Sequence, residues 1–434
     1  QTPARASVDP SQVRYRVAGM GGNYCFAIES PVTRHTLEHL QVRAARTEMS
    51  LKLWAPRQLA GDLSSNDYSP YAAADTPNSR IRRELELMQE IQRKGIPYTI
   101  SVWRMPSWLG QPVSQPAREE RWRITPAHWP AVLHALGTYL LYAREKYQVE
   151  PNYFSFNEAN LGVDVLLTAE EHREAIKRIG AHFARLGLKT KLLLGDVAGP
   201  RGSHVYAEPA ANDPEALKYV GAVSFHSWGG AKAEQYAAWA DLAERLKLPL
   251  IVAEAGPDAG AWQTRAYRTF PYAVREMVHY QELLLHARPQ SILYWEFTGD
   301  YSLLASQRPA QEGKVLTERF CLQKHWCDLI PPGSEALGIK CETDGVLVTA
   351  FRSGKNYTVH ISNAKWERPF TLTGLPASLQ TLQVIRTAEG EYFKKLGTTP
   401  VESGKVALTL PAESLTTLTT LEVGEATPMK STER

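Results

Sequence analysis

Several classes of protein are excluded by what the sequence has little of. Its 434 residues include only four cysteines, and no two have the CxxC spacing of a zinc knuckle or a thioredoxin-like site. No apolar run approaches the roughly 18 residues that span a bilayer. The formal net charge is +3, which gives no sign of a nucleic-acid-binding surface. We therefore expect no membrane span, no nucleic-acid partner, and thiols that are mostly free or buried.

The dinucleotide-binding GxGxxG motif and the HxH and HExxH metal motifs are missing as well. The segment Gly19-Met20-Gly21-Gly22 lacks the GxGxxG spacing of a dinucleotide-binding turn, and neither HxH nor HExxH occurs. Aromatic residues are plentiful, with 11 Trp and 19 Tyr, and many stand beside polar residues at the ends of apolar runs. This placement favours a ligand with flat faces, such as a sugar ring.

Short apolar runs alternate with amphipathic helical stretches over the first 330 residues. Helix 79–94 has near-helical apolar spacing, and Thr168 with Glu171 forms a capping-box pattern before another helix. Further helices are expected at 232–246 and 266–287. This rhythm predicts an α/β fold, a (β/α)8 TIM barrel, rather than an open doubly wound sheet. The expected barrel strands are 15–19, 49–54, 97–103, 152–157, 190–196, 220–226, 248–254 and 291–297.

The pattern changes after Ile330-Pro331-Pro332-Gly333. Short alternating runs separated by turn residues follow, which predicts an all-β sandwich. We expect an N-terminal arm (1–14), the catalytic barrel (15–332), the sandwich domain (333–424) and a frayed polar tail (425–434). The expected sandwich strands are 345–351, 356–362, 368–373, 380–386, 405–410 and 415–423.

Two carboxylates stand where a barrel keeps its catalytic groups, at the carboxyl ends of strands. Glu158 follows the fourth expected strand within Asn157-Glu158, and Glu254 ends the seventh. The fourth and seventh strands face each other across a barrel mouth, so both side chains can reach one sugar. Glycoside hydrolysis needs such a pair, one carboxyl protonated and the other ionised. Solvated loop glutamates are the alternative interpretation.

These features resemble the clan A glycoside hydrolases, and within them the sequence is most similar to glycoside hydrolase family 30. The resemblance covers nearly the whole chain. It includes the segment from Ser101 to Trp108, Lys324-His325-Trp326 before the sandwich, and the closing Leu410-Pro411-Ala412-Glu413. It implies that Glu158 is the general acid/base and Glu254 the nucleophile of a retaining enzyme. Family members have an N-terminal strand that feeds the side sandwich, whereas we expect only a short arm here.

Other polar and aromatic residues at strand ends are candidates for substrate binding. Asn157 can donate to a sugar 2-hydroxyl, and His226 can orient Glu254 or contact a hydroxyl. Glu296 can bind a hydroxyl or support the site, and it is the rival nucleophile. Arg104 can pair with Glu254 or bind an acidic sugar, and Asp196 can bind substrate or hold a loop. The tryptophans, some of which are alternatively core residues, are Trp54, Trp103, Trp228 and Trp295, the last as a platform under the ring.

The resulting hypothesis is a retaining β-glycoside hydrolase that acts on β-linked poly- or oligosaccharides and requires no metal or organic cofactor. The polar start of the sequence, without an initiator Met, leads us to expect a secreted or periplasmic protein. A non-catalytic sugar-binding barrel is the first alternative. A metal-dependent hydrolase using His226, Glu254 and Glu296 is the second.

Overall fold

The computed structural model describes residues 2–59, 62–113 and 121–431. By their internal contacts these residues form two compact units. One takes in the chain up to Gly22, residues 30–43 and the chain from Ala255 onward; the other takes in residues 23–29 and 44–254. Among the described residues, no helix is long and apolar enough to cross a bilayer.

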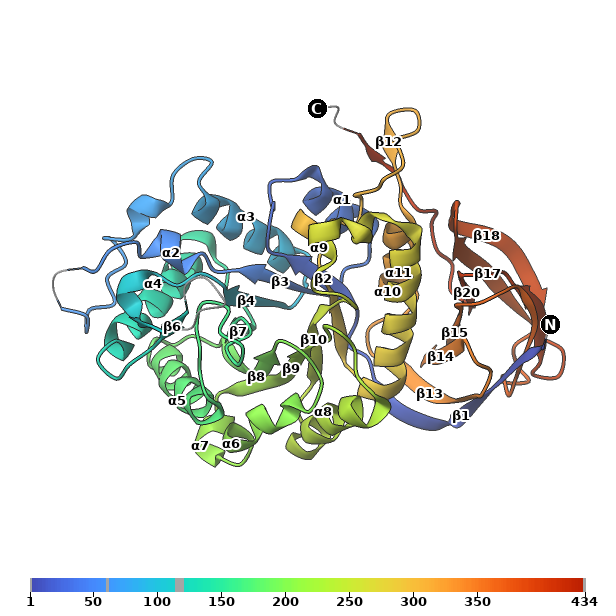
Figure 1. The fold of residues 1–434 in the computed structure, drawn as a ribbon, viewed down its shortest axis with the longest axis horizontal. Coiled ribbons are helices and arrows are strands. Elements are labelled where there is room, and N and C mark those ends of the chain that lie inside the picture. The colour runs from blue at the N-terminus through green and yellow to red at the C-terminus, as the bar shows by residue number, and fades with distance from the viewer. Residues whose placement is uncertain (1, 60–61, 114–120, 432–434) are drawn as a thin grey trace. The chain divides into compact units, whose positions relative to one another are not determined.

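The predicted barrel is confirmed. Eight parallel strands close into a ring in the order β10-β11-β2-β3-β4-β7-β8-β9 (Figure 1). The expected third to eighth strands match the observed ones to within about three residues. The barrel strands are β2 (Gly21–Tyr24), β3 (Ala44–Glu48), β4 (Tyr98–Val102), β7 (Tyr153–Phe156), β8 (Lys191–Val197), β9 (Val220–His226), β10 (Leu250–Ala255) and β11 (Ser291–Tyr294).

The first two expected strands are wrong. Residues 15–19 do not open the barrel, because β1 (Ala4–Arg16) ends within them and belongs to the other sheet. Residues 49–54 follow a barrel strand instead of forming one, and their second half is the short helix α2 (Leu51–Trp54). The true second strand, β3, has the sequence Ala-Ala-Arg-Thr-Glu and is buried throughout. Its two charged residues hid it from a search for apolar runs.

The helices follow the barrel strands as expected. Ser79 caps α3, and the Thr168 hydroxyl accepts from the Glu171 amide at the start of α5, as a capping residue should. The longer helices are α1 (Pro31–His39), α3 (Arg80–Arg93), α4 (Trp129–Tyr147), α5 (Ala169–Arg185), α8 (Ala233–Leu246), α10 (Phe270–Glu282) and α11 (Glu318–Asp328). The short ones besides α2 are α6 (Glu208–Ala211), α7 (Pro214–Leu217) and α9 (Ala261–Thr264).

The C-terminal quarter forms the predicted all-β structure. Nine strands make one hydrogen-bonded sheet in the order β18-β17-β20-β15-β14-β13-β1-β16-β19. Apolar residues from both halves of this sheet share one core, among them Val348, Leu372 and Leu418, so the sheet folds over onto itself as a sandwich. Besides β1, its strands are β13 (Glu335–Cys341), β14 (Val346–Ser353), β15 (Asn356–Asn363), β16 (Arg368–Thr373), β17 (Thr381–Ala388), β18 (Glu391–Pro400), β19 (Val406–Leu410) and β20 (Ser414–Thr419).

The N-terminal segment is a sandwich strand rather than a free arm. In Figure 1 the blue β1 runs beside the orange β13, and the register pairs Val8 with Ile339. On its other edge β1 pairs in parallel with β16, Ala6 opposite Leu372. Alternate residues of β1 enter the core, because one face of the strand packs inward. We keep the domain boundary near residue 332 as a proposal.

Two small two-stranded sheets lie outside the barrel sheet and the nine-stranded sheet. The pair β5 (Gln111–Pro112) and β6 (Trp122–Arg123) is one, and β12 (Lys314–Val315) with β21 (Met429–Lys430) is the other. The second of these sheets corrects the expectation of a frayed tail, because part of 425–434 is held as a strand, and residues 432–434 lie outside the described residues. The four cysteines carry free thiols, as expected.

Candidate active site

The structure brings Glu158 and Glu254 together at the carboxyl ends of β7 and β10. A carboxylate oxygen of one lies within 4.8 Å of a carboxylate oxygen of the other. Glu158 has a left-handed backbone, φ 48°, and its amide donates to the Asp196 carbonyl at 3.1 Å. The side chains are nearly buried, with 9% of Glu158 and 4% of Glu254 exposed. This spacing and shelter allow both carboxyls to act on one bond.

His226, at the end of β9, lies between the two glutamates. Its Nδ1 is 2.9 Å from Glu158 Oε1 and 3.2 Å from Glu254 Oε2. Its Nε2 donates to Asp196 Oδ1 at 2.7 Å. The ring is fully buried. His226 therefore contacts carboxylates with both nitrogens, which agrees with the expected role of orienting Glu254.

Arg46, on β3, is the functional residue that the sequence analysis missed. Its Nη1 donates to Glu254 Oε1 at 2.9 Å, and its Nη2 donates to Asp196 Oδ2 at 3.1 Å and Asn157 Oδ1 at 2.7 Å. The guanidinium is fully buried, which requires paired charges around it. The signal available in the sequence was an arginine at the centre of a short segment, Ala44–Glu48, with the length of a buried strand.

Asp196, on β8, connects several polar side chains of the cluster. Besides Arg46 and His226, its carboxylate accepts from the Ser155 hydroxyl at 2.6 Å. Ser155 in turn lies 2.6 Å from the Ser101 hydroxyl, and the Arg46 Nε donates to that same hydroxyl at 3.1 Å. The network connects four neighbouring strands through polar side chains, so the site is rigid where the barrel is otherwise apolar.

The two glutamates have opposite pKa shifts. Burial raises the pKa of Glu158, and the charge of Glu254 adds to this against the opposing hydrogen bond from His226. Burial alone would raise the pKa of Glu254 too, but the His226 and Arg46 charges and a hydrogen bond from Trp228 lower it below 4.5. Environments that separate two carboxyl pKa values in this way assign one as acid and the other as base or nucleophile.

Three other predicted residues lie against this cluster. The oxygen of the Asn157 amide accepts from Arg46, which directs the amide nitrogen elsewhere as a donor. Trp228 donates its indole N–H to Glu254 Oε2 at 2.9 Å, so it holds the carboxylate. Trp103 stacks over the Arg46 guanidinium, 4.3 Å from ring centroid to Cζ. All three therefore support the charged groups, and direct contact with a substrate stays a prediction.

Two predicted roles are corrected. Arg104 does not pair with Glu254, since its charge lies 3.6 Å from Asp164 and its side chain is 64% exposed; Arg46 takes the role expected of it. Trp54 is a core residue, fully buried among Tyr71, Tyr139 and Tyr142. It borders a cavity of about 430 Å³ beside Leu53 and Pro70, which no residue of the carboxylate cluster lines.

Trp295 and Glu296 follow β11 in the other compact unit. Trp295 is 5% exposed and Glu296 is fully buried. Their expected roles, a platform and a hydroxyl-binding residue, stay predictions.

One further arrangement bears on metal binding. One atom each of Glu158, His226 and Glu254 lies within 4.8 Å of the others, close enough to share an ion. Burial would lower the pKa of His226, but Glu254 and Asp196 raise it well above 6.5. A protonated imidazole offers no lone pair to a metal, so an ion would have to displace that proton to bind here.

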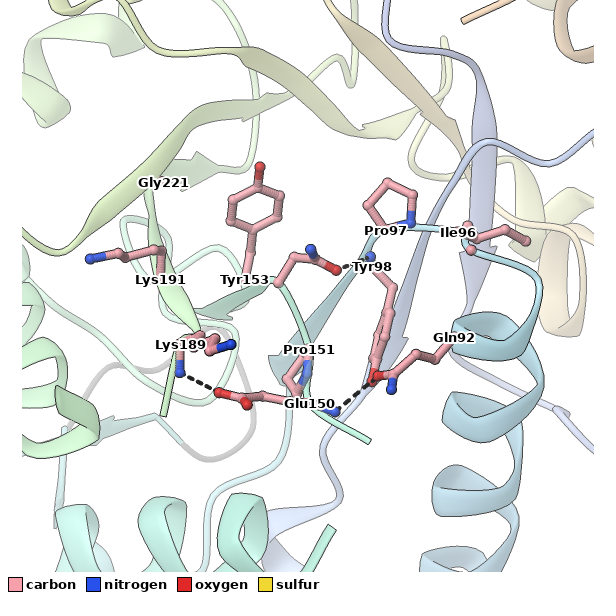
Figure 2. Close-up of a pocket in the computed structure, with 12 residues that line it drawn as sticks. Gln92, Ile96, Pro97, Tyr98, Glu150, Pro151, Tyr153, Lys189, Lys191 and Gly221 are labelled. Atoms are coloured by element: carbon pink, nitrogen blue, oxygen red, sulfur yellow. Dashed lines mark hydrogen bonds between the residues drawn. The ribbon is translucent and has the colours of Figure 1, made fainter. Parts of the chain in front are cut away.

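A cavity of about 650 Å³ lies at the opposite end of the barrel, at the amino ends of the strands. Figure 2 shows its lining, where the Glu150 amide donates to Gln92 and the Tyr98 amide to Asn152. Tyr153 and Lys191 also line it. No carboxylate of the cluster lines it. In barrels of this kind this face supports stability, whereas the carboxyl ends carry chemistry.

The fold of this protein matches known structures, although its sequence matches no known family model. No protein-family model matches the sequence, and no curated protein sequence matches it either. A family 30 glycoside hydrolase endoxylanase from Clostridium papyrosolvens superposes with a TM-score of 0.76 at 14% identity, over 96% of this chain and 99% of that chain. The fold is that of the family 30 glycoside hydrolases.

Two further structures extend this likeness. A family 30, subfamily 8 xylanase from Clostridium acetobutylicum has a TM-score of 0.74 at 14% identity, with 96% of this chain and 99% of that chain covered. An endo-β-1,6-glucanase has a TM-score of 0.64 at 12% identity, with 98% and 94% covered. The expected resemblance to family 30 is thus confirmed at the level of the fold.

Proposed function

We propose that the protein is a retaining glycoside hydrolase that cleaves β-linked poly- or oligosaccharides. The observation that carries this proposal is the pair Glu158 and Glu254, with oxygens within 4.8 Å and opposite pKa shifts. Carboxyls about 5–5.5 Å apart suit double displacement, whereas about 6.5–9.5 Å leaves room for the water of an inverting enzyme. The short separation favours retention.

The roles follow from the two environments. Glu254, ionised between Arg46 and His226, attacks the anomeric carbon while Glu158 gives its proton to the leaving oxygen. A glycosyl ester on Glu254 forms and the glycosidic bond breaks. Glu158, now ionised, takes a proton from water, which attacks the anomeric carbon and releases Glu254. Neither step consumes a cofactor.

The substrate class rests on the fold likeness alone. The similar structures include xylanases and an endo-β-1,6-glucanase, so β-linked plant and microbial glycans form the test panel. We also propose that the protein acts outside the cytoplasm, where such polymers occur. Product sizing on each polymer distinguishes internal from terminal cleavage.

Trapping of the covalent intermediate tests the nucleophile. A 2-fluoro glycoside that is slow to turn over should label Glu254, and Glu254→Gln should lose at least about a thousandfold in kcat. Early product NMR should show the β-anomer first, with the α-anomer appearing by mutarotation. Label on Glu296, or an α-anomer from the start, would refute the assignment.

Substrates with different leaving groups test Glu158. Glu158→Ala should slow poor leaving groups by about 10²–10⁴-fold, the usual contribution of a general acid, and activated aryl glycosides far less. Azide should restore part of the turnover. Equal losses on both substrates without rescue would remove Glu158 from the role.

The alternatives are distinguished by the same assays. A purely sugar-binding protein would bind glycans without releasing nitrophenol from any aryl β-glycoside. A metal-dependent enzyme would lose activity in a chelator and regain it with a divalent ion, whereas we expect no change.

A further inference from the structure

We propose that Asp196 is a positioning residue that keeps His226 as an imidazolium, so that one buried cation stands between the two catalytic glutamates. As a statement about catalysis, this inference rests on the proposed function. As a statement about charge, it stands on the geometry of β8 and β9.

Both ring nitrogens of His226 face carboxylate oxygens, Nδ1 those of Glu158 and Glu254 and Nε2 that of Asp196. Nε2 faces only the Asp196 carboxylate at 2.7 Å, and an ionised carboxylate can only accept. Nδ1 lies 3.2 Å from Glu254 Oε2, which already accepts from the Trp228 indole. A bare Nδ1 could accept from a protonated Glu158 at 2.9 Å but would repel Glu254 Oε2, whereas a protonated Nδ1 can donate to both oxygens; we therefore assign it a proton.

Charge balance gives the same result. With His226 protonated, two cations, Arg46 and His226, stand against two carboxylates, Asp196 and Glu254, and Glu158 keeps its proton. The cluster is then neutral, which lowers the cost of burying its charges. The hydrogen bond from His226 goes to Glu158 Oε1, which leaves the other oxygen of Glu158 to carry the acidic proton. Without the Asp196 charge, the cluster would hold an uncompensated cation.

The backbone of β8 is shaped for this residue. Gly195 and Asp196 have φ values of 105° and 52°, and the register with β9 shifts between Gly195 and Val197. A Cβ on Gly195 would lie 2.4 Å from the Ser224 carbonyl, so only glycine fits there. The Gly195 amide donates to His172 Nε2 at 3.1 Å, and the Asp196 carbonyl accepts from the Glu158 amide. The bend therefore aims the Asp196 side chain at His226 and holds Glu158 by the main chain.

Besides Asp196, the charged or titratable groups near His226 come from five neighbouring elements. Glu158 after β7, Glu254 on β10 and Arg46 on β3 are in the cluster itself. His172 on α5 lies beneath Asp196 and is kept neutral, since burial lowers its pKa to about 4. Cys25 interacts with Arg46 from the end of β2.

The test is the protonation state of His226 in Asp196→Asn, a variant of the same shape without the charge. In the wild-type protein, NMR of labelled imidazoles should show His226 protonated through pH 8, with His226→Gln identifying its signal. In Asp196→Asn the pKa of His226 should fall by about 1–3 units, the usual effect of removing an adjacent opposite charge. With the cation lost, the acid limb of kcat/KM should move to higher pH by a similar amount.

Asp75→Asn is the matched control. Asp75 is a buried carboxylate in the same unit that accepts from an arginine and two tyrosines. Its loss should affect stability and leave the pH profile unchanged. If Asp196→Asn does not fold, His226→Gln should move the acid limb in the same direction.

Two results would overturn the proposal. One is a neutral His226 at pH 7 in the wild-type protein, and the other is an acid limb that stays in place in the variant while the protein remains folded. The NMR result does not need turnover, so failure of the proposed glycosidase activity would be seen separately in the aryl glycoside assay.

Discussion

Two groups of buried histidines have opposite electrostatic fates. His226 in the barrel is fully buried, and its pKa is raised well above 6.5 by Glu254 and Asp196 against the effect of burial. His360 on β15 and His325 on α11 are equally buried in the sandwich unit. Burial lowers the pKa of His360 to about 3 and that of His325 well below 6.5.

The partners explain the difference. His325 contacts the hydroxyls of Thr417 and Thr387 at 2.7 and 2.9 Å, and His360 contacts the same Thr417 hydroxyl at 2.7 Å. A hydroxyl can donate to a neutral imidazole or accept from it, so no charge is needed. Carboxylates around His226 select the cation instead. Burial therefore indicates neither a functional nor a structural histidine; the charge of the neighbours does.

Removing the second cation from the barrel cluster should have the largest effect. Arg46→Met leaves Asp196 and Glu254 buried without their shared partner, and breaking such a pair costs about 3–5 kcal/mol of unfolding free energy. The pKa of Glu254 should rise, and the acid limb of kcat/KM should move up with it. Urea unfolding and pH profiles measure both. Arg104→Met, an exposed arginine, is the control, and an equal loss in both variants would contradict the assignment.

Acid should destabilise the sandwich through His360, the opposite of its effect through His226 alone. A histidine held neutral in the fold stabilises it fully above its unfolded pKa of 6.5, and this contribution is lost as pH falls towards the folded value of about 3 for His360. The unfolding free energy should fall by up to about 1.4 kcal/mol per pH unit for this group.

His360→Gln isolates that contribution. Over pH 3–6.5 the variant should show a shallower dependence of unfolding free energy on pH than the wild-type protein, because glutamine does not titrate. Unfolding curves at several pH values measure the slopes. Identical slopes would mean that His360 is already protonated or exposed to solvent.

Thr417 sharpens the comparison on the sandwich side. Thr417→Val removes the hydroxyl that both histidines share and should cost about 1–3 kcal/mol, the usual cost of an unsatisfied buried polar group. Thr417→Ser keeps the hydroxyl and should recover most of this. Thermal unfolding at pH 7 measures it. Equal losses in both variants would indicate a packing effect.

The smallest effect is expected at Trp54. Trp54→Phe changes packing against Tyr139 and Tyr142 and removes the bond to Thr138, so kcat/KM should stay within about twofold. Trp228→Phe, which removes a hydrogen bond to a charged group, should lose about tenfold. A higher KM in Trp54→Phe with unchanged stability would restore Trp54 to the groove.

The sequence allowed a residue of the site to be predicted where that residue stands at the end of an apolar strand. Glu158 and Glu254 end apolar strands, so position and chemistry agreed. Arg46 lies inside a buried strand whose charged residues make it unlike an apolar run. The carboxylates that neutralise it, Asp196 and Glu254, come from distant parts of the sequence and meet it only in the closed barrel. Arg104 was the more visible arginine, but its exposure follows from a loop that no local pattern reveals. The strand β1 was missed because its alternation includes exposed charged and polar residues.

The place of β1 in its sheet has a consequence for how the chain is made. This strand lies between β13 and β16, so residues 4–16 complete the sheet only when residues 335–373 have been synthesised. In the strand order, the antiparallel pair β16 and β19 joins the rest of the sheet through β1. During translation the N-terminal strand must therefore wait unpaired while the barrel emerges. A deletion of β1 would therefore affect assembly of the last quarter of the chain, where its partner strands lie.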